Sequence, residues 1–303
     1  MKNAINYNLF GITICSEIQL PSVMRGSIGA DAYIRYGKVP SQLKQAKIVY
    51  PNIQMNETQF LYDLGKSGRF LVQNGQEIIV EATEEINGIQ LGLFLLESVV
   101  LGALLQQRGY LLLHACAITD GNSAIVFLGK SGSGKSTTAA AFLERGYKLL
   151  TDDICAIKFD ENSMAYVYPS FPQQRLQLDT LRYLHKRTDY KQYPQTEKYL
   201  VPVDSVFHTK AVSLEEIYIL ETSEQPQLTI TGLSKLERIP YFYQHLAFPQ
   251  FVTYKNEEYL RQFASLAGKI STHKISRALQ NQMLDDLLEI VILRHKAVNL
   301  LSK

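Results

Sequence analysis

Cysteine is scarce in this chain of 303 residues, which contains only Cys15, Cys116 and Cys155. The three cysteines are widely spaced, and no two of them form a C-x-x-C pair. This pattern argues against a disulfide framework and against a zinc site, and it predicts reduced thiols in a cytoplasmic protein.

The net charge is small, and long hydrophobic runs are rare. The formal net charge is only +2, so the composition predicts no general attraction to nucleic acid or to membrane surfaces. The opening "MKNAINYNLFG" lacks the apolar core of a signal peptide. The most apolar stretch, 91–105, is too short to span a bilayer and carries Glu97, so we expect a buried helix there.

Turn signals divide the N-terminal part of the chain into short apolar and aromatic runs. Examples are "AYIRYG", "GRFLVQ" and "EIIVEA", which are rich in β-branched and aromatic residues. We therefore expect a β-rich N-terminal unit over residues 1–87. A helix over 88–107 begins the second predicted domain, 88–303, whose last 40 residues are expected to be largely helical.

Two predicted strands joined by a tight turn precede the most informative motif. The segments "YLLLHACAI" and "AIVFLG" flank "TDGNS", and an Asp-Gly turn between apolar runs is a strong hairpin signal. The second strand leads directly into "GKSGSGKSTT", residues 129–138, and an Ala-rich helix ending at Gly146 follows. Because a hairpin is antiparallel, we expect an α/β core with a mixed sheet.

The stretch 129–138 matches the phosphate-binding pattern G-x-x-x-x-G-K-[ST], the P-loop or Walker A motif. Its glycines permit backbone angles that turn consecutive N–H groups toward phosphate oxygens, and the following helix adds its positive end. A flexible Gly/Ser linker is the alternative, but the strand before the loop and the helix after it favour nucleotide binding. The residues expected to bind ATP are Gly129, Ser131, Gly132, Ser133, Gly134, Lys135, Ser136 and Thr137, with Lys135 reaching the β- and γ-phosphates and Ser136 facing Mg²⁺.

An acidic pair follows this helix at once, at the tip of the apolar run "YKLL". A single helix therefore returns Asp152 and Asp153 toward the loop, where one carboxylate can hold Mg²⁺ and the other can accept a proton from a hydroxyl. The alternative is a turn in which both aspartates only accept hydrogen bonds from backbone amides. His114, in the first strand of the hairpin, is expected near Asp153, although a lone histidine in an apolar strand is as often a core residue.

Taken together, these motifs resemble the catalytic core of HPr serine kinase/phosphorylase and its relatives. The resemblance runs from about residue 108 to residue 180 and includes "HACAI", "GKSGSGKSTT", "ERGYKLLTDD" and "YPSFPQQRL" at matching intervals. It implies an HPr-kinase-like P-loop core that uses ATP and Mg²⁺, and it makes 88–303 a nucleotide-binding catalytic domain.

The same resemblance implies a role for each matching residue. Lys135 matches the family's phosphate-binding lysine, Ser136 its metal-binding serine and Asp153 its acid/base. Asp152 matches the preceding carboxylate, a candidate metal ligand, and His114 matches the active-site histidine. The family's further Mg²⁺-binding glutamate and its surrounding signature are missing, and "SFPQQRLQLD" stands in their place, with Gln173, Gln174 and Arg175 as polar side chains.

A second resemblance concerns the acceptor. "YNLFGITICSEIQLPS" and "LLQQRGYLLLHACAI" are similar to HPr-kinase-like proteins encoded with peptide-tailoring systems. This implies phosphorylation of a small protein or a ribosomally made precursor peptide, such as a lasso-peptide precursor at its C-terminal serine. In keeping with the small net charge, no nucleic-acid or membrane partner is expected. Whether the chain forms a homo-oligomer is left open. The alternatives are an ATP-binding sensor without transfer, an HPr-type kinase/phosphorylase, and a small-molecule kinase or phosphoenolpyruvate-carboxykinase-like enzyme.

Two further sets of cations are candidates for the site. Arg175 lies nearest to the predicted core and is our preferred second cation at the γ-phosphate. A basic stretch downstream could bind nucleotide phosphates or an acidic peptide, but a solvated surface loop is the favoured interpretation. Its charges are Arg182, Lys186, Arg187, Lys191 and Lys198.

Overall fold

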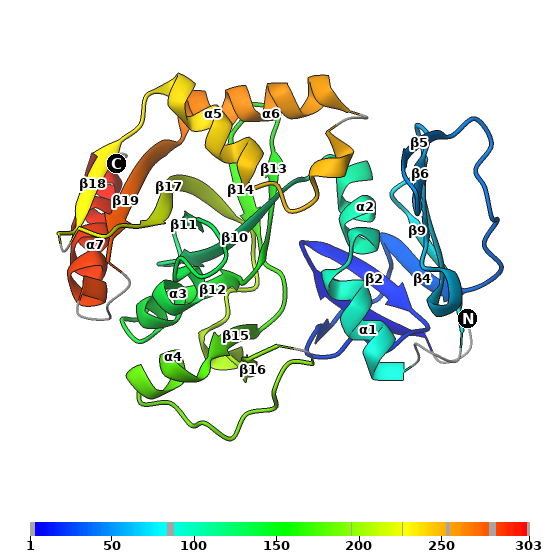
Figure 1. Cartoon of the computed structure of the whole chain (residues 1–303), viewed down its shortest axis with the longest axis horizontal. Helices are drawn as coiled ribbons and strands as arrows, with labels where there is room; N and C mark the ends of the chain where they lie inside the picture. The colour runs from blue at the N-terminus through cyan, green and yellow to red at the C-terminus, as the bar shows by residue number, and fades with distance from the viewer. Residues whose placement is uncertain are drawn as a thin grey trace. The chain divides into compact units, whose positions relative to one another are not determined.

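The computed structural model describes residues 4–83, 88–194, 196–225, 227–252, 255–278 and 283–301. The chain divides into two compact units (Figure 1). The first consists of Met1–Leu112, Ala156–Lys158 and Ala247–Arg261, and the second of Leu113–Cys155, Phe159–Leu246 and Gln262–Lys303. The domain boundary predicted at residue 87 falls outside the described residues and stays a prediction.

The first unit is built on a nine-stranded sheet, so the N-terminal part of the chain is rich in β-structure, as the sequence predicts. The strand order is β3-β1-β2-β4-β9-β8-β7-β6-β5. Strand β4 is parallel to both of its neighbours, β2 and β9, while pairs such as β1–β2 and β8–β9 are antiparallel. The strands are β1 Ile5–Leu9, β2 Ile12–Ser16, β3 Met24–Arg25, β4 Ala32–Tyr36, β5 Lys47–Tyr50, β6 Ile53–Met55, β7 Gln59–Asp63, β8 Gly68–Gln73 and β9 Glu77–Ala82, with the 3-10 turn η1 at Gly65–Ser67.

The predicted helix over 88–107 is two helices, α1 (Gly88–Glu97) and α2 (Val99–Gln107), which differ in direction by 50°. Ser98 lies between them with an extended backbone, and its Oγ accepts a hydrogen bond from the N–H of Val100. A serine at this position can cap a new helix, which explains the break that the apolar pattern alone did not predict. Among the described residues, no single helix is long and apolar enough to cross a membrane; only the bent α1–α2 pair, taken together, reaches that length and composition.

The second unit is organised by a mixed eight-stranded sheet, in agreement with the predicted fold class. Its order is β11-β10-β13-β14-β17-β19-β18, with β12 paired to β10 and a further pairing of β11 with β17. Strands β10 and β11 form the predicted antiparallel hairpin, whereas β11, β17 and β19 are parallel neighbours. The strands are β10 Leu111–Thr119, β11 Ser123–Leu128, β12 Lys148–Thr151, β13 Ile154–Phe159, β14 Ala165–Tyr168, β17 Val212–Thr222, β18 Thr229–Gly232 and β19 Ser271–Arg277; β15 Gln173–Gln177 and β16 Lys198–Pro202 form a separate two-stranded ribbon.

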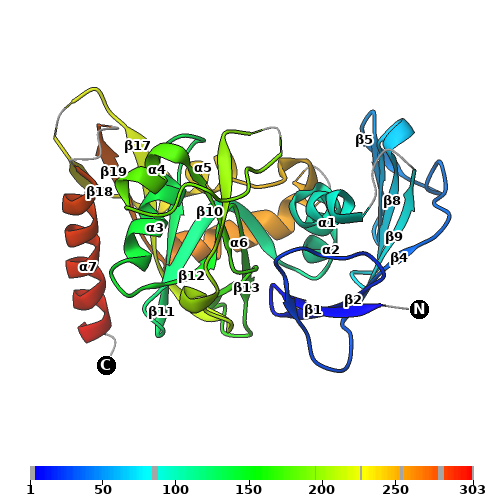
Figure 2. The same cartoon turned by 90° about the horizontal axis from the view of Figure 1, so that it is seen from below.

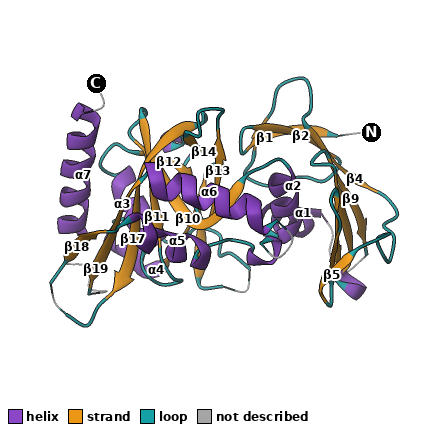
Figure 3. Cartoon of the chain, turned by 90° about the horizontal axis from the view of Figure 1, so that it is seen from above, coloured by secondary structure: helices purple, strands orange, loops and turns teal. Residues whose placement is uncertain are grey.

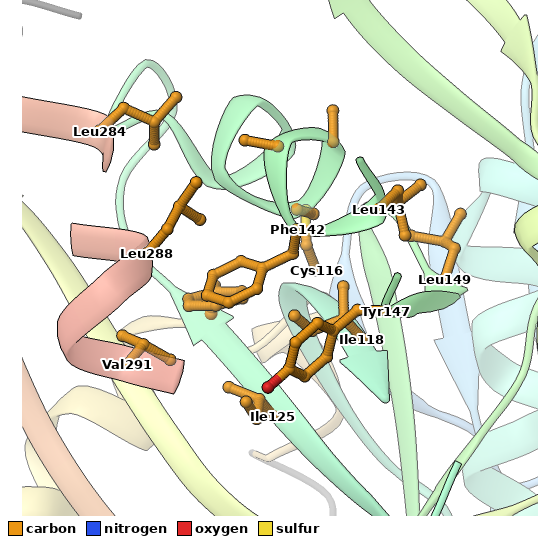
Figure 4. Close-up of a cluster of buried hydrophobic side chains, with 14 of the residues drawn as sticks. Cys116, Ile118, Ile125, Phe142, Leu143, Tyr147, Leu149, Leu284, Leu288 and Val291 are labelled. Carbon is orange, nitrogen blue, oxygen red and sulfur yellow. The ribbon is translucent and has the colours of Figure 1, made fainter. Parts of the chain in front are cut away.

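Helices surround this sheet (Figure 3), and one of them positions the glycine loop. Helix α3 packs Phe142 against Phe127 of β11, with ring centroids 5.6 Å apart, and against apolar side chains of α7 (Figure 4). Helix α4 lies beside the start of α3 (Figure 2), where Thr137 and Thr180 share a hydrogen bond of 2.8 Å. The helices of the second unit are α3 Lys135–Leu143, α4 Leu178–Tyr183, α5 Lys235–Gln244 and α7 Leu284–Leu301, with the 3-10 turn η2 Asp204–Val206. Helix α6, Asn256–Lys269, is divided between the two units, and the 3-10 turn η3, Pro249–Phe251, belongs to the first.

The described part of the C-terminal segment is largely helical, as predicted, but it also contains a strand. Strand β19 lies between α6 and α7 and pairs in parallel with β17 over its whole length. Its sequence, "STHKISR", is polar, but Thr272 and Ile275 are buried in the sheet. The strand therefore depends on its partner β17, a long-range contact that local periodicity does not reveal.

Candidate active site

The glycine loop connects the end of β11 to the start of α3 and adopts backbone angles that favour glycine. The φ angles of Gly132 and Gly134 are 84° and 90°, in the left-handed region. At Gly129 a Cβ atom would lie 2.6 Å from the carbonyl oxygen of Leu220, so the neighbouring strand leaves no room for a side chain. The loop thus delivers the free N–H groups at the start of α3 to a concave surface, a geometry that favours anions.

Lys135 is the first residue of α3, and its ammonium group folds back over the loop. Its Nζ donates hydrogen bonds to the carbonyl oxygens of Gly129 (2.7 Å) and Lys130 (3.2 Å). The residue is buried, and burial lowers the pKa of its ammonium group below the ordinary value. A buried ammonium whose hydrogen bonds among the described residues go to neutral carbonyls is well suited to pair with a phosphate.

Ser136 and Asp152 meet at the foot of the loop. Ser136 Oγ donates to Asp152 Oδ1 over 2.9 Å, and the backbone N–H of Arg175 donates to Asp152 Oδ2 over 2.8 Å. Cys116 also lies here, and its thiol donates to Asp152 Oδ1 over 2.8 Å. Burial, followed by the charge of Asp152, raises the pKa of the Cys116 thiol well above its ordinary value, so the thiol is a neutral donor.

The pair of Ser136 and Asp152 fits the way proteins hold Mg²⁺. Mg²⁺ is usually bound by one or two carboxylate or hydroxyl oxygens, with phosphate oxygens and water completing an octahedron. The described part of the chain holds no cluster of three or more His, Cys, Asp and Glu side chains that could retain a metal without such help. The donor set therefore suits a metal that arrives with a phosphate.

Asp153 lies between a histidine and an arginine. Its Oδ1 is 3.2 Å from His114 Nδ1, and its Oδ2 is 2.6 Å from Arg175 Nη2. Burial opposes ionisation, but the hydrogen bond with His114 and the charge of Arg175 outweigh it and hold the pKa of Asp153 well below its ordinary range. The carboxylate is therefore ionised, and it would become a stronger base if Arg175 turned from it to a bound phosphate.

The backbone at Asp153 is also unusual, because its φ angle is +95° in a residue that is not glycine. Its carbonyl accepts a hydrogen bond from the N–H of Ala115, which ties the β12–β13 turn to β10. Conformations of this kind cost free energy and gather at functional sites. The turn therefore holds the carboxylate toward His114 rather than only capping backbone amides.

One cavity of about 670 Å³ collects these groups, and we call it the main cavity. Almost all of the predicted site residues line it; the exceptions are Gly129, Ser133 and Asp152. Ser133 is buried, and its hydroxyl has no hydrogen-bond partner among the described residues. The residues that line the main cavity are His114, Cys116, Ser131, Gly132, Gly134, Lys135, Ser136, Thr137, Asp153, Arg175, Leu176, Gln177, Asp179, Thr180, Lys198 and Arg277.

Arg277 is a cavity residue that sequence reasoning missed. It is 5% exposed and lies so close to the loop that its Nη2 is 2.6 Å from where a Cβ on Gly134 would be. Within the described residues its Nε has no hydrogen-bond partner and its guanidinium forms no ion pair with a carboxylate. Only the pairing of β19 with β17, which sets Arg277 opposite Thr222, brings it to the loop.

The predicted basic stretch contributes one residue to the cavity, Lys198 of β16. Arg182 and Arg187 pair with Asp179 and Asp189 on the surface, at 3.7 Å and 2.8 Å. The remaining lysines also lie away from the main cavity: Lys186 pairs with Glu144, and Lys191 is exposed. The stretch is thus mainly a solvated surface segment, the interpretation that the sequence favoured.

No protein-family model and no curated protein matches this sequence. Among solved structures, the chain is similar to the HPr(Ser) kinase/phosphatase from Coxiella burnetii. The TM-score is 0.33 and the sequence identity 12%, over 63% of this chain and 93% of that one. A similarity at this level carries no conclusion about function.

Proposed function

We propose that this protein is an ATP-dependent kinase with a P-loop core that transfers the γ-phosphoryl group to a serine hydroxyl. The observation that carries the proposal is the presence, in one cavity, of the glycine loop with Lys135 and of the Asp153–His114 pair. Nucleotide binding alone needs the loop but no group that accepts a proton, whereas transfer to a hydroxyl needs both.

In the proposed reaction, the loop N–H groups and Lys135 bind the phosphates, and Ser136 and Asp152 would hold Mg²⁺. When bound, Mg²⁺ would neutralise negative charge on the β- and γ-phosphate oxygens. A bond forms between the serine oxygen and the γ-phosphorus, the bond to the bridging oxygen breaks, and the serine proton passes to Asp153. His114 orients this carboxylate through the 3.2 Å contact, and Arg175 stabilises charge on the transferring group.

The acceptor is proposed from the sequence. The similarity to HPr-kinase-like proteins of peptide-tailoring systems supports a ribosomally made precursor peptide, with the C-terminal serine of a lasso-peptide precursor as the specific acceptor. A short peptide would give the enzyme a hydroxyl that reaches into the main cavity past the glycine loop. The HPr-type phosphorylase direction is not part of the proposal, because the corresponding signature is missing from the sequence.

One observation favours a second function, ATP binding without transfer. Arg175 already forms a 2.6 Å ion pair with the carboxylate that should accept the proton. If that ion pair persisted with ATP bound, Arg175 would keep Asp153 a weak base, and the loop would act only as a nucleotide sensor.

The two functions are separated by incubating the protein with Mg·ATP labelled at the γ-phosphate and with a degenerate library of serine peptides. Incorporation of label into serine supports the kinase. ATP binding by calorimetry without any labelled peptide or released phosphate supports the sensor. Lys135→Ala is the negative control and should abolish ATP binding in either case.

A further inference from the structure

A second cavity, of about 520 Å³, also uses the glycine loop as a wall, and we call it the side cavity. It shares Ser131 and Gly132 with the main cavity. Its volume is in the range of small-ligand sites. Its walls are Gly129, Lys130, Ser131, Gly132 and Ser133 of the loop, Ile219, Leu220, Glu221 and Thr222 at the end of β17, and Tyr241, Gln244 and His245 at the end of α5.

The two cavities differ in charge. Four cations line the main cavity, namely Lys135, Arg175, Lys198 and Arg277, whereas Lys130 is the one Lys or Arg that the described residues contribute to the side cavity. Glu221, the acidic wall residue, already accepts a hydrogen bond from Tyr241 and lies 3.5 Å from Lys274. The side cavity is therefore a poor site for a polyphosphate and a better site for a polar, weakly charged substrate.

His245 links the side cavity to the proposed acid/base pair. The backbone N–H of His114 donates to the carbonyl of His245 over 2.7 Å, next to an antiparallel bridge between Leu113 and Leu246. His114 and His245 therefore lie opposite each other and are joined through their backbones. A wall residue of the side cavity is thus hydrogen-bonded through its backbone to His114, which lines the main cavity with Asp153.

The hydrogen bonding of His245 leaves one ring nitrogen without a partner. Its Nδ1 is 2.7 Å from the carbonyl oxygen of Tyr241, which can only accept, so Nδ1 carries the proton and Nε2 is a hydrogen-bond acceptor. His245 is 6% exposed, and in the described part of the chain no donor reaches Nε2. Burial, assisted by the charges of Lys135 and His114, lowers the pKa of His245, which keeps the ring neutral.

We propose that the side cavity binds the phosphoryl acceptor, a serine-containing peptide, and that His245 Nε2 accepts a hydrogen bond from an N–H or O–H group of that peptide. The inference rests on the proposed kinase function. It gives a role to a buried acceptor atom that has no partner among the described residues, since unpaired buried polar groups are rare. His245 is a substrate-binding residue in this account, not the group that takes the proton.

Two substitutions separate the ring nitrogens. His245→Asn retains an amide N–H that can replace Nδ1 but removes the acceptor at Nε2, whereas His245→Gln places an amide oxygen near the Nε2 position. His208→Asn is the matched control, because His208 lines neither cavity. The probes are ATP in calorimetry, and a degenerate serine-peptide library with γ-labelled ATP.

We expect His245→Asn to bind ATP within about twofold of wild type, and to lose at least about tenfold in kcat/KM for the peptides, mainly through KM. His245→Gln should recover part of that loss, and His208→Asn should resemble wild type. If His245→Asn phosphorylates the peptides as well as wild type does, the inference is overturned. It is also overturned if ATP binding falls in parallel, because the side cavity then belongs to the nucleotide.

Failure of the kinase proposal gives a different result: wild type binds ATP but labels no peptide, and the inference falls with it. If His245→Asn does not fold, wild type labelled with ¹⁵N-histidine provides the test. The Nε2 resonance of His245 should then shift on addition of a peptide selected from the library and not on addition of ATP alone. The opposite response would refute peptide binding at His245.

Discussion

Ser136 Oγ donates a hydrogen bond of 2.9 Å to Asp152 Oδ1, which joins the first turn of α3 to the end of β12. The two residues are 16 positions apart, and the intervening helix returns the chain to the loop that it left. A hydroxyl and a carboxylate in contact at the base of a phosphate-binding loop form the ligand pair that Mg²⁺ would share with a nucleotide.

From this contact we predict that Asp152→Asn weakens ATP binding only when Mg²⁺ is present. Loss of a charged ligand should lower the affinity for Mg·ATP at least about tenfold. Removing a residue that only hydrogen-bonds to a metal ligand already lowers metal affinity by about 10- to 100-fold. Affinity for ATP in the presence of a chelator should barely change. Calorimetry with and without Mg²⁺ measures both, and Asp189→Asn is the control, since that exposed carboxylate lines neither cavity. Equal losses with and without Mg²⁺ would contradict the metal role.

A second prediction concerns Arg277, the buried guanidinium at Gly134. Hydrogen bonds to charged groups contribute about 1.5–3 kcal/mol, so Arg277→Met should weaken ATP binding about 10- to 100-fold. Without ATP the same variant should be at least as stable as wild type, because an uncompensated buried cation is removed. Thermal melting with and without ATP tests both expectations, with the exposed Arg182→Met as control. A variant that is destabilised without ATP but binds it normally would make Arg277 a structural residue.

A third prediction concerns the pH dependence of stability. His295 of α7 is buried, with Nδ1 2.8 Å from Glu216 and Nε2 3.1 Å from Ser123 Oγ. Burial alone would lower its pKa, but the hydrogen bond and charge of Glu216, with the charge of Asp120, outweigh burial and raise it. The stabilisation is thus complete below about pH 6.5, the unfolded pKa, and is lost as the pH rises through the folded pKa.

His295→Gln should therefore destabilise the protein most at about pH 6, by about 3–5 kcal/mol, because Glu216 remains buried without its charged partner. The difference from wild type should shrink as the pH rises. Urea unfolding of both proteins at a series of pH values gives this difference in unfolding free energy. The other histidines contribute equally to both proteins, so their pKa shifts do not affect the difference. A difference that does not vary with pH would show that His295 is neutral in the folded protein.

The parts of the site that were predicted from the sequence depend on short-range patterns. The glycine loop, the hairpin before it and the Asp152–Asp153 turn after it are neighbours along the chain, so their residue types and spacing specify their arrangement. The parts that were missed depend on distant pairings. Arg277 reaches the loop through the parallel β17–β19 pair, and His245 reaches His114 through an isolated bridge. Neither pairing leaves a periodic signal in the sequence.

The break at Ser98 was missed for a different reason. Apolar residues continue through α1 and α2, so hydrophobicity alone predicts one helix. The break depends on a single capping serine, Ser98. Its cap contributes about 1 kcal/mol, which is enough to separate two helices only when the rest of the fold also favours the break. The strand β19 was not predicted because its sequence is mostly polar. Its buried residues are separated by lysine, histidine and serine.

The central claim is that Asp153 accepts the proton of the acceptor hydroxyl, and the variant Asp153→Asn tests it most directly. Asparagine keeps the shape and the hydrogen bonds and tolerates a positive φ angle, but it cannot take the proton. Loss of a general base typically costs about 10²–10⁴ in rate. ATP affinity by calorimetry and serine phosphorylation by mass spectrometry are measured on this variant and on His114→Gln. We predict near-normal ATP binding in Asp153→Asn, with kcat lowered by that factor, and a smaller loss in His114→Gln. Full phosphorylation by Asp153→Asn would contradict the account and transfer the base to His114.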